Sequence, residues 1–279
     1  MELSCRIWWD SSIFFQMNPQ ERGLLMKLQI LIADSGGRTE QNLDLLRSVI
    51  ADTEFEIGKY TSDLQEAVTL LLARRFDLLI CINRSPGYIA AKLLRLTRSI
   101  TEQIPAIVIS ESEDSQRMRE CFLLGAIDFL SEPVPHEDLM HALERGGSLV
   151  HARLINSEYQ SAMEQSLSEL PHTEQNAPVI AKLEEFLRRT ADQTATVELA
   201  ADHFGFNRDY FGRYFKGKFG ITFGDFYKSF QMHYAMRLLE SGQFKVLDVS
   251  RQLGFSSPDY FTRVFKRRTG KVPSDVRKL

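Results

Sequence analysis

Asp209-Tyr-Phe-Gly-Arg-Tyr-Phe-Lys-Gly-Lys-Phe-Gly220 recurs fifty residues later as Asp259-Tyr-Phe-Thr-Arg-Val-Phe-Lys-Arg-Arg-Thr-Gly270. Seven of the twelve positions are identical, and each copy follows a Gly-Phe pair, Gly205-Phe206 or Gly254-Phe255. A repeat that appears only twice is too sparse for a solenoid, which stacks three or more units. The pattern indicates a duplicated supersecondary unit in the last third of the chain.

Each copy is predicted to form a helix, a tight turn and a second helix. In the first copy, Thr196 is placed to cap the first helix, Gly205 suits the turn and Asn207 caps the second helix. In the second copy, Ser257 and Pro258 are residue types typical of a cap and a first helical position.

The second helix of each copy has an apolar face and a cationic face. The apolar positions are Phe211, Tyr214 and Phe215, matched by Phe261, Val264 and Phe265. The opposite positions are Asp209, Gly212, Arg213 and Lys216, matched by Asp259, Thr262, Arg263 and Lys266. A packed helix that presents Arg and Lys outward after a glycine turn is typical of the recognition helix of a helix-turn-helix. Apolar residues at helical spacing over 223–239 predict a helix that joins the two units, whose recognition helices would then lie about 34 Å apart, one turn of B-DNA.

This region, residues 178–279, resembles the AraC/XylS-family DNA-binding domain. The second-unit signature stands as Gly254-Phe-Ser-Ser-Pro-Asp-Tyr-Phe-Thr-Arg-Val-Phe-Lys266, followed by Gly270-Lys-Val-Pro273 and Arg277. Three positions depart from the family pattern: the linker-helix arginine is Gln231, the threonine before the late proline is Val272, and a late tyrosine is Val276. The resemblance implies an all-α domain with two helix-turn-helix units that binds double-stranded DNA.

The DNA-binding roles follow from residue type. We expect Arg213 and Arg263 to read bases, since an arginine can bond bidentately to guanine, and Thr262 to offer a methyl group to thymine. Gly212 offers no side chain, so the recognition helix of the first copy is expected either to be less selective or to approach the DNA more closely. Other cations are expected to meet phosphates and to set affinity rather than sequence. These are Lys216, Lys218, Lys266, Arg267 and Arg268, and Arg208 and Ser257 complete the predicted DNA-binding set.

Charge divides the chain at the same place. Residues 177–279 hold 18 Lys/Arg and 11 Asp/Glu, a balance of +7, whereas residues 1–176 have a balance of −10. A basic module joined to an acidic one is typical of a polyanion-binding module carried by a partner that does not bind it, although uneven surface charge is the alternative. The composition, 43% hydrophobic and 25% charged, excludes disordered and collagen-like chains, and no apolar run is long enough for a membrane span. Three scattered cysteines suit a reducing cytosol, so a cytoplasmic protein is expected.

The N-terminal part alternates short apolar runs with amphipathic stretches. Leu28–Ala33, Asp77–Ile82 and Ala106–Ile109 are continuous apolar runs, as expected of strands that are buried on both faces of a parallel sheet. Residues 43–50 and 64–73 between them have helical periodicity, so a doubly wound, flavodoxin-like α/β domain is predicted.

This domain, residues 27–146, resembles the response-regulator receiver domain. The matching stretches are Ile30-Leu-Ile-Ala-Asp34, Asp77-Leu-Leu-Ile80 with Pro86-Gly87, Ile104-Pro-Ala-Ile-Val-Ile-Ser110, and Leu124-Gly-Ala-Ile-Asp-Phe-Leu130 with Pro133. In that family an aspartate after the third strand accepts a phosphoryl group, an acidic pair binds magnesium and a lysine contacts the phosphoryl group. The family's switch positions are Ser110 and Phe129 here.

The residues that carry this chemistry are replaced. The acceptor position, counted from Asp77 and from Pro86, is Ile82, the acidic pair is reduced to Asp34-Ser35, and the lysine position is Glu132. A hydrocarbon cannot form an acyl phosphate, and Mg²⁺ prefers several convergent oxygen ligands. With Ser110, these residues form a degenerate pocket for which we expect no metal and no cofactor. The chain is therefore interpreted as a regulator with a pseudo-receiver that acts without phosphorylation.

The sequence leaves two other functions as alternatives. The first is a conventional phosphorelay regulator phosphorylated at a non-standard residue, Asp34 or Asp77; Asp34 lacks a lysine partner and Asp77 begins its strand. The second is a flavodoxin-like enzyme, but the sequence has no Gly-rich phosphate loop, nucleophile elbow or metal-ligand cluster, so no catalytic residue is assigned. Asn83 and Ser110 either line a pocket for a small-molecule or protein ligand or cap loops.

Two segments complete the domain map. Residues 147–177 are expected to be a helical segment and a linker, in which Ile155, Tyr159, Met163 and Leu167 form a stripe that either mediates a homodimer or packs on its own receiver domain. Residues 1–26 fit neither module. Glu21-Arg22-Gly23 can be encoded by an unbroken purine tract where a ribosome-binding site would lie, which favours translation from Met26; a genuine N-terminal arm is the alternative.

Overall fold

The computed structural model describes residues 27–277, apart from 37–38, 52, 74, 85–87, 99–103, 112–113 and 192. The hypothesis of translation from Met26 lies outside the described residues. The chain divides into two compact units between Arg153 and Leu154, within helix α7 (His136–Ser168). In the part of the chain that the structure describes, no helix combines the length and the apolar character needed to cross a bilayer.

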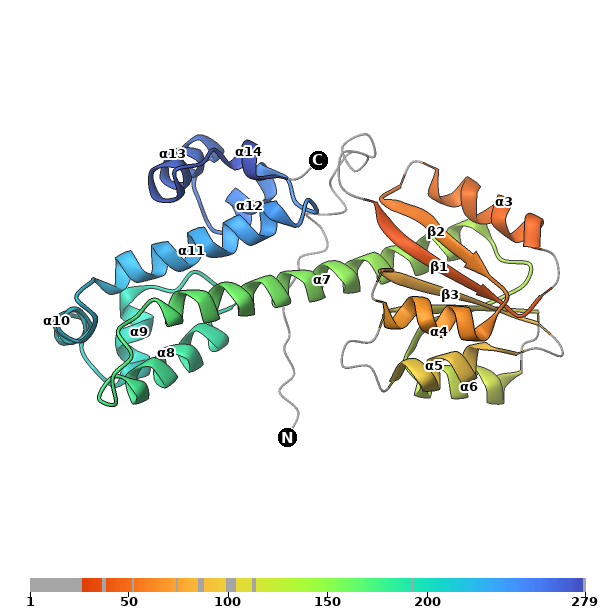
Figure 1. The fold of residues 1–279 in the computed structure, drawn as a ribbon, viewed down its shortest axis with the longest axis horizontal. Coiled ribbons are helices and arrows are strands. Elements are labelled where there is room, and N and C mark those ends of the chain that lie inside the picture. The colour runs from red at the N-terminus through yellow and green to blue at the C-terminus, as the bar shows by residue number, and fades with distance from the viewer. Residues whose placement is uncertain are drawn as a thin grey trace. The chain divides into compact units, whose positions relative to one another are not determined.

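The first unit is built on a five-stranded parallel sheet (Figure 1). Its strands lie in the order β2-β1-β3-β4-β5. Their bounds are β1 (Leu28–Asp34), β2 (Phe55–Thr61), β3 (Leu78–Asn83), β4 (Ala106–Ser110) and β5 (Ala126–Ser131). The apolar runs predicted as strands form β1, β3 and β4, the three inner strands, whose residues are nearly all buried because helices cover both faces. The doubly wound α/β prediction is confirmed.

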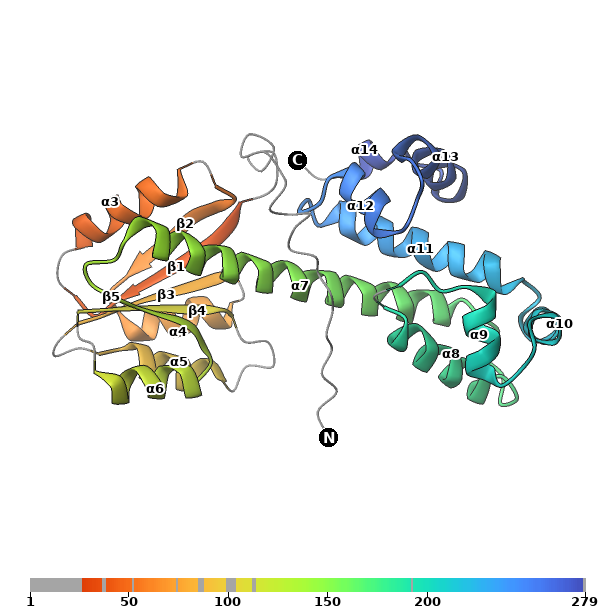
Figure 2. The same ribbon diagram turned by 180° about the vertical axis from the view of Figure 1, so that it is seen from behind.

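Helices cover both faces of this sheet, as Figures 1 and 2 show from opposite sides. One face packs against α3 (Thr39–Ile50) and the first half of α7 through a core that contains Ile30, Ile80 and Ile82. The other face packs against α4 (Leu64–Leu72), α5 (Ala90–Arg98) and α6 (Ser115–Leu123). Alternate residues of each strand point to opposite faces, so Ile82 belongs to the first core and Cys81 to the second.

The second unit is helical in the described residues. It contains the end of α7, then α8 (Ala177–Arg189), α9 (Val197–Phe204), α10 (Arg208–Phe219), α11 (Phe223–Glu240), α12 (Val246–Gln252), α13 (Pro258–Thr269) and α14 (Pro273–Val276). The predicted caps are confirmed: Thr196, Asn207 and Ser257 accept hydrogen bonds from backbone amides at the starts of α9, α10 and α13. Gly205 has a φ of 75°, so the turn between α9 and α10 needs the left-handed conformation that glycine adopts easily. The two pairs α9–α10 and α12–α13 are the predicted repeats, and α11 is the predicted joining helix.

The stripe on α7 packs differently from both expectations. Ile155, Tyr159, Met163 and Leu167 are buried in the core of the second unit. The Tyr159 ring meets the rings of Phe230 and Tyr234 on α11 edge-on, at centroid distances of 5.1 and 5.3 Å. The predictions that this stripe mediates a dimer or packs on the receiver domain are therefore wrong, because its apolar face is already covered by the neighbouring helices of its own unit.

Candidate DNA interface and receiver pocket

The sheet register brings the predicted pocket residues to one edge. Asp34, the last residue of β1, pairs with Ile82 of β3, and Asn83 pairs with Ser110 at the end of β4. Glu132 follows β5, and its amide donates to the carbonyl of Ser110 at 2.8 Å. These residues therefore lie at the carboxyl ends of the strands, where open α/β sheets bind ligands.

Ile82, the residue predicted to occupy the acceptor position, is part of the core. Ile82 has no exposed surface and packs with Ile32 and Ile109 on the side of the sheet that α3 and α7 cover. The Ile82 side chain has no oxygen that could accept a phosphoryl group.

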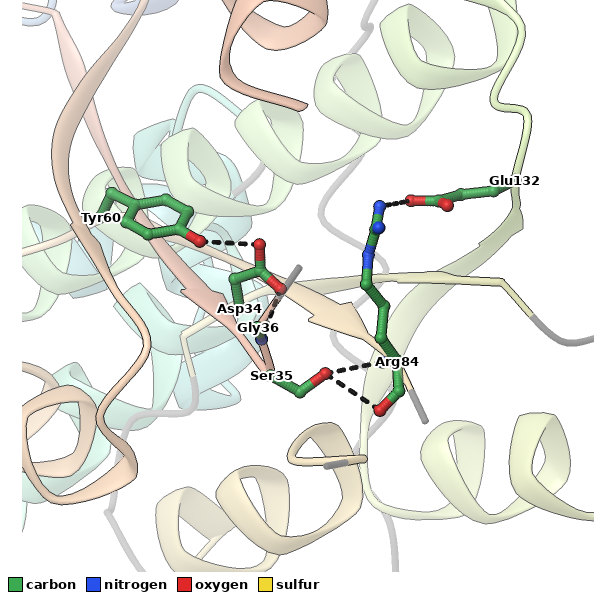
Figure 3. A network of polar contacts seen from close by, with 6 residues as sticks. All are labelled: Asp34, Ser35, Gly36, Tyr60, Arg84 and Glu132. Atoms are coloured by element: carbon green, nitrogen blue, oxygen red, sulfur yellow. Dashed lines mark hydrogen bonds and ion pairs between the residues drawn. The ribbon is translucent and has the colours of Figure 1, made fainter. Parts of the chain in front are cut away.

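Asp34 is fully buried, and protein donors occupy both of its carboxylate oxygens. The Tyr60 hydroxyl donates to Oδ2 at 2.7 Å, and the amide of Gly36 donates to Oδ1 at 3.0 Å (Figure 3). The neighbouring Ser35 bonds to a different loop. Its Oγ accepts from the amide of Arg84 at 2.7 Å and donates to the carbonyl of Arg84 at 3.2 Å. Both residues of the former acidic pair are thus used in internal hydrogen bonds.

Arg84 and Glu132 form an ion pair across the same edge (Figure 3). Arg84 lies two residues after Ile82, its side chain is 9% exposed and the Glu132 side chain is 23% exposed. The pair places a cation beside β3 and an anion after β5, the reverse of the aspartate and lysine that the receiver family has at these two strand ends. The negative charge of Glu132 is therefore neutralised within the fold.

The pocket does not fit a magnesium ion. Mg²⁺ needs near-octahedral oxygen ligands, usually from one or two carboxylates and several waters. Asp34 is the only carboxylate from the family's metal-binding set that remains, and Tyr60 and Gly36 already bond to it. Among the described residues, no group of three or more His, Cys, Asp or Glu side chains is arranged to hold a metal.

Two further polar residues of the sheet have structural partners. Asn83 Oδ1 accepts from the amide of Ala90 at 3.0 Å and so caps the start of α5. Asp77 precedes β3, at the opposite end of the strand from Ile82, and its carboxylate accepts from the amide of Gln29 at 2.8 Å. Burial raises the pKa of Asp77, an effect that the Gln29 hydrogen bond partly opposes.

In the second unit, α10 and α13 present matching exposed faces. Arg213 and Lys216 on α10, and Arg263 and Lys266 on α13, are exposed at equivalent positions. Their opposite faces are buried as predicted: Phe211, Phe215, Phe261 and Phe265 have no exposed surface. All four cationic residues are thus exposed, and the Arg263 guanidinium lies 5.9 Å from the centre of the Tyr260 ring.

Four other predicted DNA-binding residues have different surroundings. Arg208 forms an exposed ion pair with Glu198 at 3.0 Å, and Lys218 is half-buried. Ser257 is half-buried and caps α13 through the amide of Tyr260. Arg268 donates to the carboxylate of Asp225 on α11 at 2.9 Å, with its side chain 25% exposed.

The pairing of Arg268 also affects the acid that it contacts. A hydrogen bond from Thr222, together with the Arg268 guanidinium, holds the pKa of Asp225 below its ordinary value. Arg268 thus joins α13 to α11, the helix that connects the two helix-turn-helix units. The sequence did not indicate this contact.

Several residues of these sites were not found from the sequence. Arg84 and Tyr60 join the predicted residues at the carboxyl edge of the sheet; the one available signal was a cation two residues after the apolar run that ends at Ile82. Tyr210 and Tyr260, equivalent in the repeat, are 47% and 41% exposed, because each lies beside rather than on the buried face of its helix. Gln231, a departure from the family pattern, donates to the carbonyl of Leu253 at 3.2 Å and so connects α11 to the end of α12.

Comparison with known families identifies both units. Residues 30–144 match the response regulator receiver domain, and residues 200–279 match the helix-turn-helix domain. The chain joins a receiver domain to an AraC-type helix-turn-helix domain. The receiver domain contains the pocket described above, and the helix-turn-helix domain contains α10 and α13.

Known proteins are similar to parts of this chain. The HTH-type transcriptional regulator GlxA of Rhizobium meliloti is 29% identical over 189 residues, which cover 63% of this chain and 57% of GlxA, so the match spans little more than half of that relative. An uncharacterized response regulatory protein of Staphylococcus epidermidis is 24% identical over 227 residues, covering 81% of this chain and 89% of the relative. A putative response regulator from Chloroflexus aurantiacus, a solved structure, is 21% identical, with a TM-score of 0.38 over 43% of this chain and 96% of that one.

Proposed function

We propose that the protein is a sequence-specific DNA-binding transcriptional regulator whose receiver domain works without phosphorylation. Exposed Arg213 and Arg263 at equivalent positions of two helix-turn-helix units support sequence reading, since arginine discriminates guanine through two hydrogen bonds. Lys216, Lys266 and Arg267 beside them supply the phosphate contacts that give affinity. Relatives named as transcriptional regulators support the same role, and binding to chromosomal DNA implies a cytoplasmic location.

The observation that carries phosphorylation independence is the packing around the acceptor position. Ile82 is fully buried, and the nearest replacement for the family's reactive pair is the Arg84–Glu132 ion pair. The predicted lysine position holds Glu132, whose carboxylate is paired with Arg84, so no lysine is present there to bind a phosphoryl dianion. The receiver domain is therefore proposed to act through a protein contact or another ligand, and a homodimer is one such contact.

The alternative is a phosphorelay regulator that uses a different acceptor. Asp34 is buried with both oxygens bonded, so attack on a phosphodonor would first require loss of the Tyr60 and Gly36 hydrogen bonds. Asp77 lies at the other end of its strand, away from Ser110 and Glu132. Neither aspartate has the surroundings of an acceptor.

A DNA-binding titration separates the two functions. A duplex selected from a random-sequence pool by the full chain is titrated at one Mg²⁺ concentration, with and without acetyl phosphate. The proposal predicts the same affinity in both conditions. A phosphodonor-dependent change in affinity would favour the phosphorelay alternative, and failure of the pool to yield any enriched sequence would contradict sequence-specific binding.

A further inference from the structure

The exposed faces of the two recognition helices differ at the positions that flank their shared cations. On α13, Thr262 and Arg267 lie on either side of the exposed Arg263–Lys266 pair. The repeat places Gly212 and Gly217 at the same two positions of α10. The first recognition helix, α10, thus has the same two central cations, but the residues that flank them have no side chains.

Nothing in the fold requires glycine at either position. A Cβ atom added to Gly212 or to Gly217 would meet no heavy atom within 4 Å, and neither residue has a positive φ. Gly147 on α7 shows the contrast, because a Cβ there would lie 2.8 Å from Oε1 of Glu54. Both α10 glycines lie in open space on a regular helix.

Glycine is nevertheless a poor choice for a helix. It loses more backbone entropy on folding than any other residue and ranks well below alanine in helix interiors. Two of the twelve residues of α10 are glycines in the helix interior. A choice that weakens the helix and that packing does not demand is best explained by a surface that something outside the chain must approach closely.

We propose that Gly212 and Gly217 form a close-approach surface through which the backbone of α10 lies against DNA. The inference rests on the proposed DNA-binding function and adds an asymmetry to it. Helix α10 lies nearer to the duplex, where Arg213 contacts bases within a tight steric fit. Helix α13 contacts bases through longer side chains. Glycine serves elsewhere in proteins to let backbone approach a ligand closely, as in loops that contact phosphates.

The test is a series of side chains of increasing size at position 212 in the full chain. Gly212→Ala, Gly212→Thr and Gly212→Val, together with Gly217→Ala, are titrated against a duplex that the wild-type chain selects from a random-sequence pool. Gly224→Ala is the control, because its Cβ also has open space, with Thr222 Oγ1 the nearest atom at 3.9 Å, and it lies on α11, outside the reading face. Thermal unfolding of each variant is measured in parallel.

The proposal predicts opposite effects on folding and on binding. Gly212→Ala and Gly217→Ala raise the unfolding temperature by about 2–4 °C, since alanine favours the helix, and weaken binding to the selected duplex about tenfold or more. Binding falls further from Ala to Thr to Val, while Gly224→Ala binds as the wild type does. Unchanged or tighter binding by Gly212→Thr, the residue type at the equivalent position of α13, would overturn the proposal, as would a lowered unfolding temperature in Gly212→Ala. If the wild-type chain selects no sequence, the DNA-binding function itself fails, a result distinct from these.

Discussion

The Arg84 guanidinium and the Glu132 carboxylate form an ion pair that joins the loop after β3 to the loop after β5. Ser35, after β1, bonds to both the amide and the carbonyl of the same Arg84. Three loops at the carboxyl edge of the sheet are therefore connected through one residue. In this receiver domain, an internal ion pair thus spans the edge of the sheet at which the strands end.

Removal of one partner of this ion pair should destabilise the receiver domain. Arg84→Met or Glu132→Gln alone is expected to cost about 1–3 kcal/mol, less than the loss for a fully buried pair because Glu132 is partly exposed. Combining the two changes should cost less than the sum of the single changes, since each single change leaves one charge without its partner and the double variant leaves none. Urea unfolding of the four proteins measures this coupling, and strictly additive effects would show that the two side chains do not interact.

The two kinds of cation on α13 should affect DNA binding differently. Arg263→Ala is expected to lose about 1–3 kcal/mol of discrimination at one base pair, because a bidentate base contact disappears. Lys266→Ala should weaken binding to specific and random DNA alike. It should also reduce the slope of the logarithm of the binding constant against the logarithm of salt concentration by about one, since one phosphate contact is lost. Titrations over a range of salt concentrations separate these effects, and equal losses on both kinds of DNA for Arg263→Ala would contradict its assigned role.

Gly147 allows α7 to lie close to the start of β2. An added Cβ would approach Oε1 of Glu54 at 2.8 Å and the Phe55 ring at 3.0 Å, and Glu54 is itself paired with buried His151 at 3.1 Å. Gly147→Ala should therefore destabilise the receiver domain by about 1–3 kcal/mol despite the better helix propensity of alanine. Chemical denaturation provides the measurement, with Gly217→Ala as the matched control in which the same change stabilises a helix.

The stability of the receiver domain should depend on pH through Asp77. Because burial raises the pKa of this carboxyl, the folded state holds the proton more tightly than the unfolded state does. The stability contributed by the protonated group is therefore present below the ordinary pKa of aspartate and is lost as the pH rises through the raised value. Asp77→Asn keeps an acceptor for the Gln29 amide and removes this dependence, so the variant should unfold at a higher temperature than the wild type at pH 7 and with a smaller difference near pH 4. A difference that grows toward acid pH would contradict this assignment.

The sequence predicted the elements whose signals are local. Alternating apolar runs identified the three inner strands, and the spacing between Asp77 and Pro86 identified Ile82 as the residue at the acceptor position. Thr196 and Asn207 were recognised as caps because a capping side chain bonds to an amide only two or three residues away.

Contacts between distant segments could not be predicted in the same way. Arg84 and Glu132 are 48 residues apart, and their pairing depends on how two loops meet at the edge of the sheet. The apolar stripe that contains Tyr159 indicated that one face of α7 is buried, but such a stripe does not specify which residues cover it. Phe230, which packs against Tyr159, lies on α11, far along the chain. The contact between Arg268 and Asp225 was not predicted for the same reason, since the two residues are 43 positions apart. The phosphate contact expected of Arg268 stays a prediction.

The most direct test of the account is the intact mass of the full chain after incubation with acetyl phosphate and Mg²⁺. An unchanged mass is expected for the wild type, because Ile82 offers no acceptor oxygen and the predicted lysine position holds Glu132, which is paired with Arg84. A gain of one phosphoryl group, located by peptide mapping at Asp34, Asp77 or any other residue of the receiver domain, would contradict it.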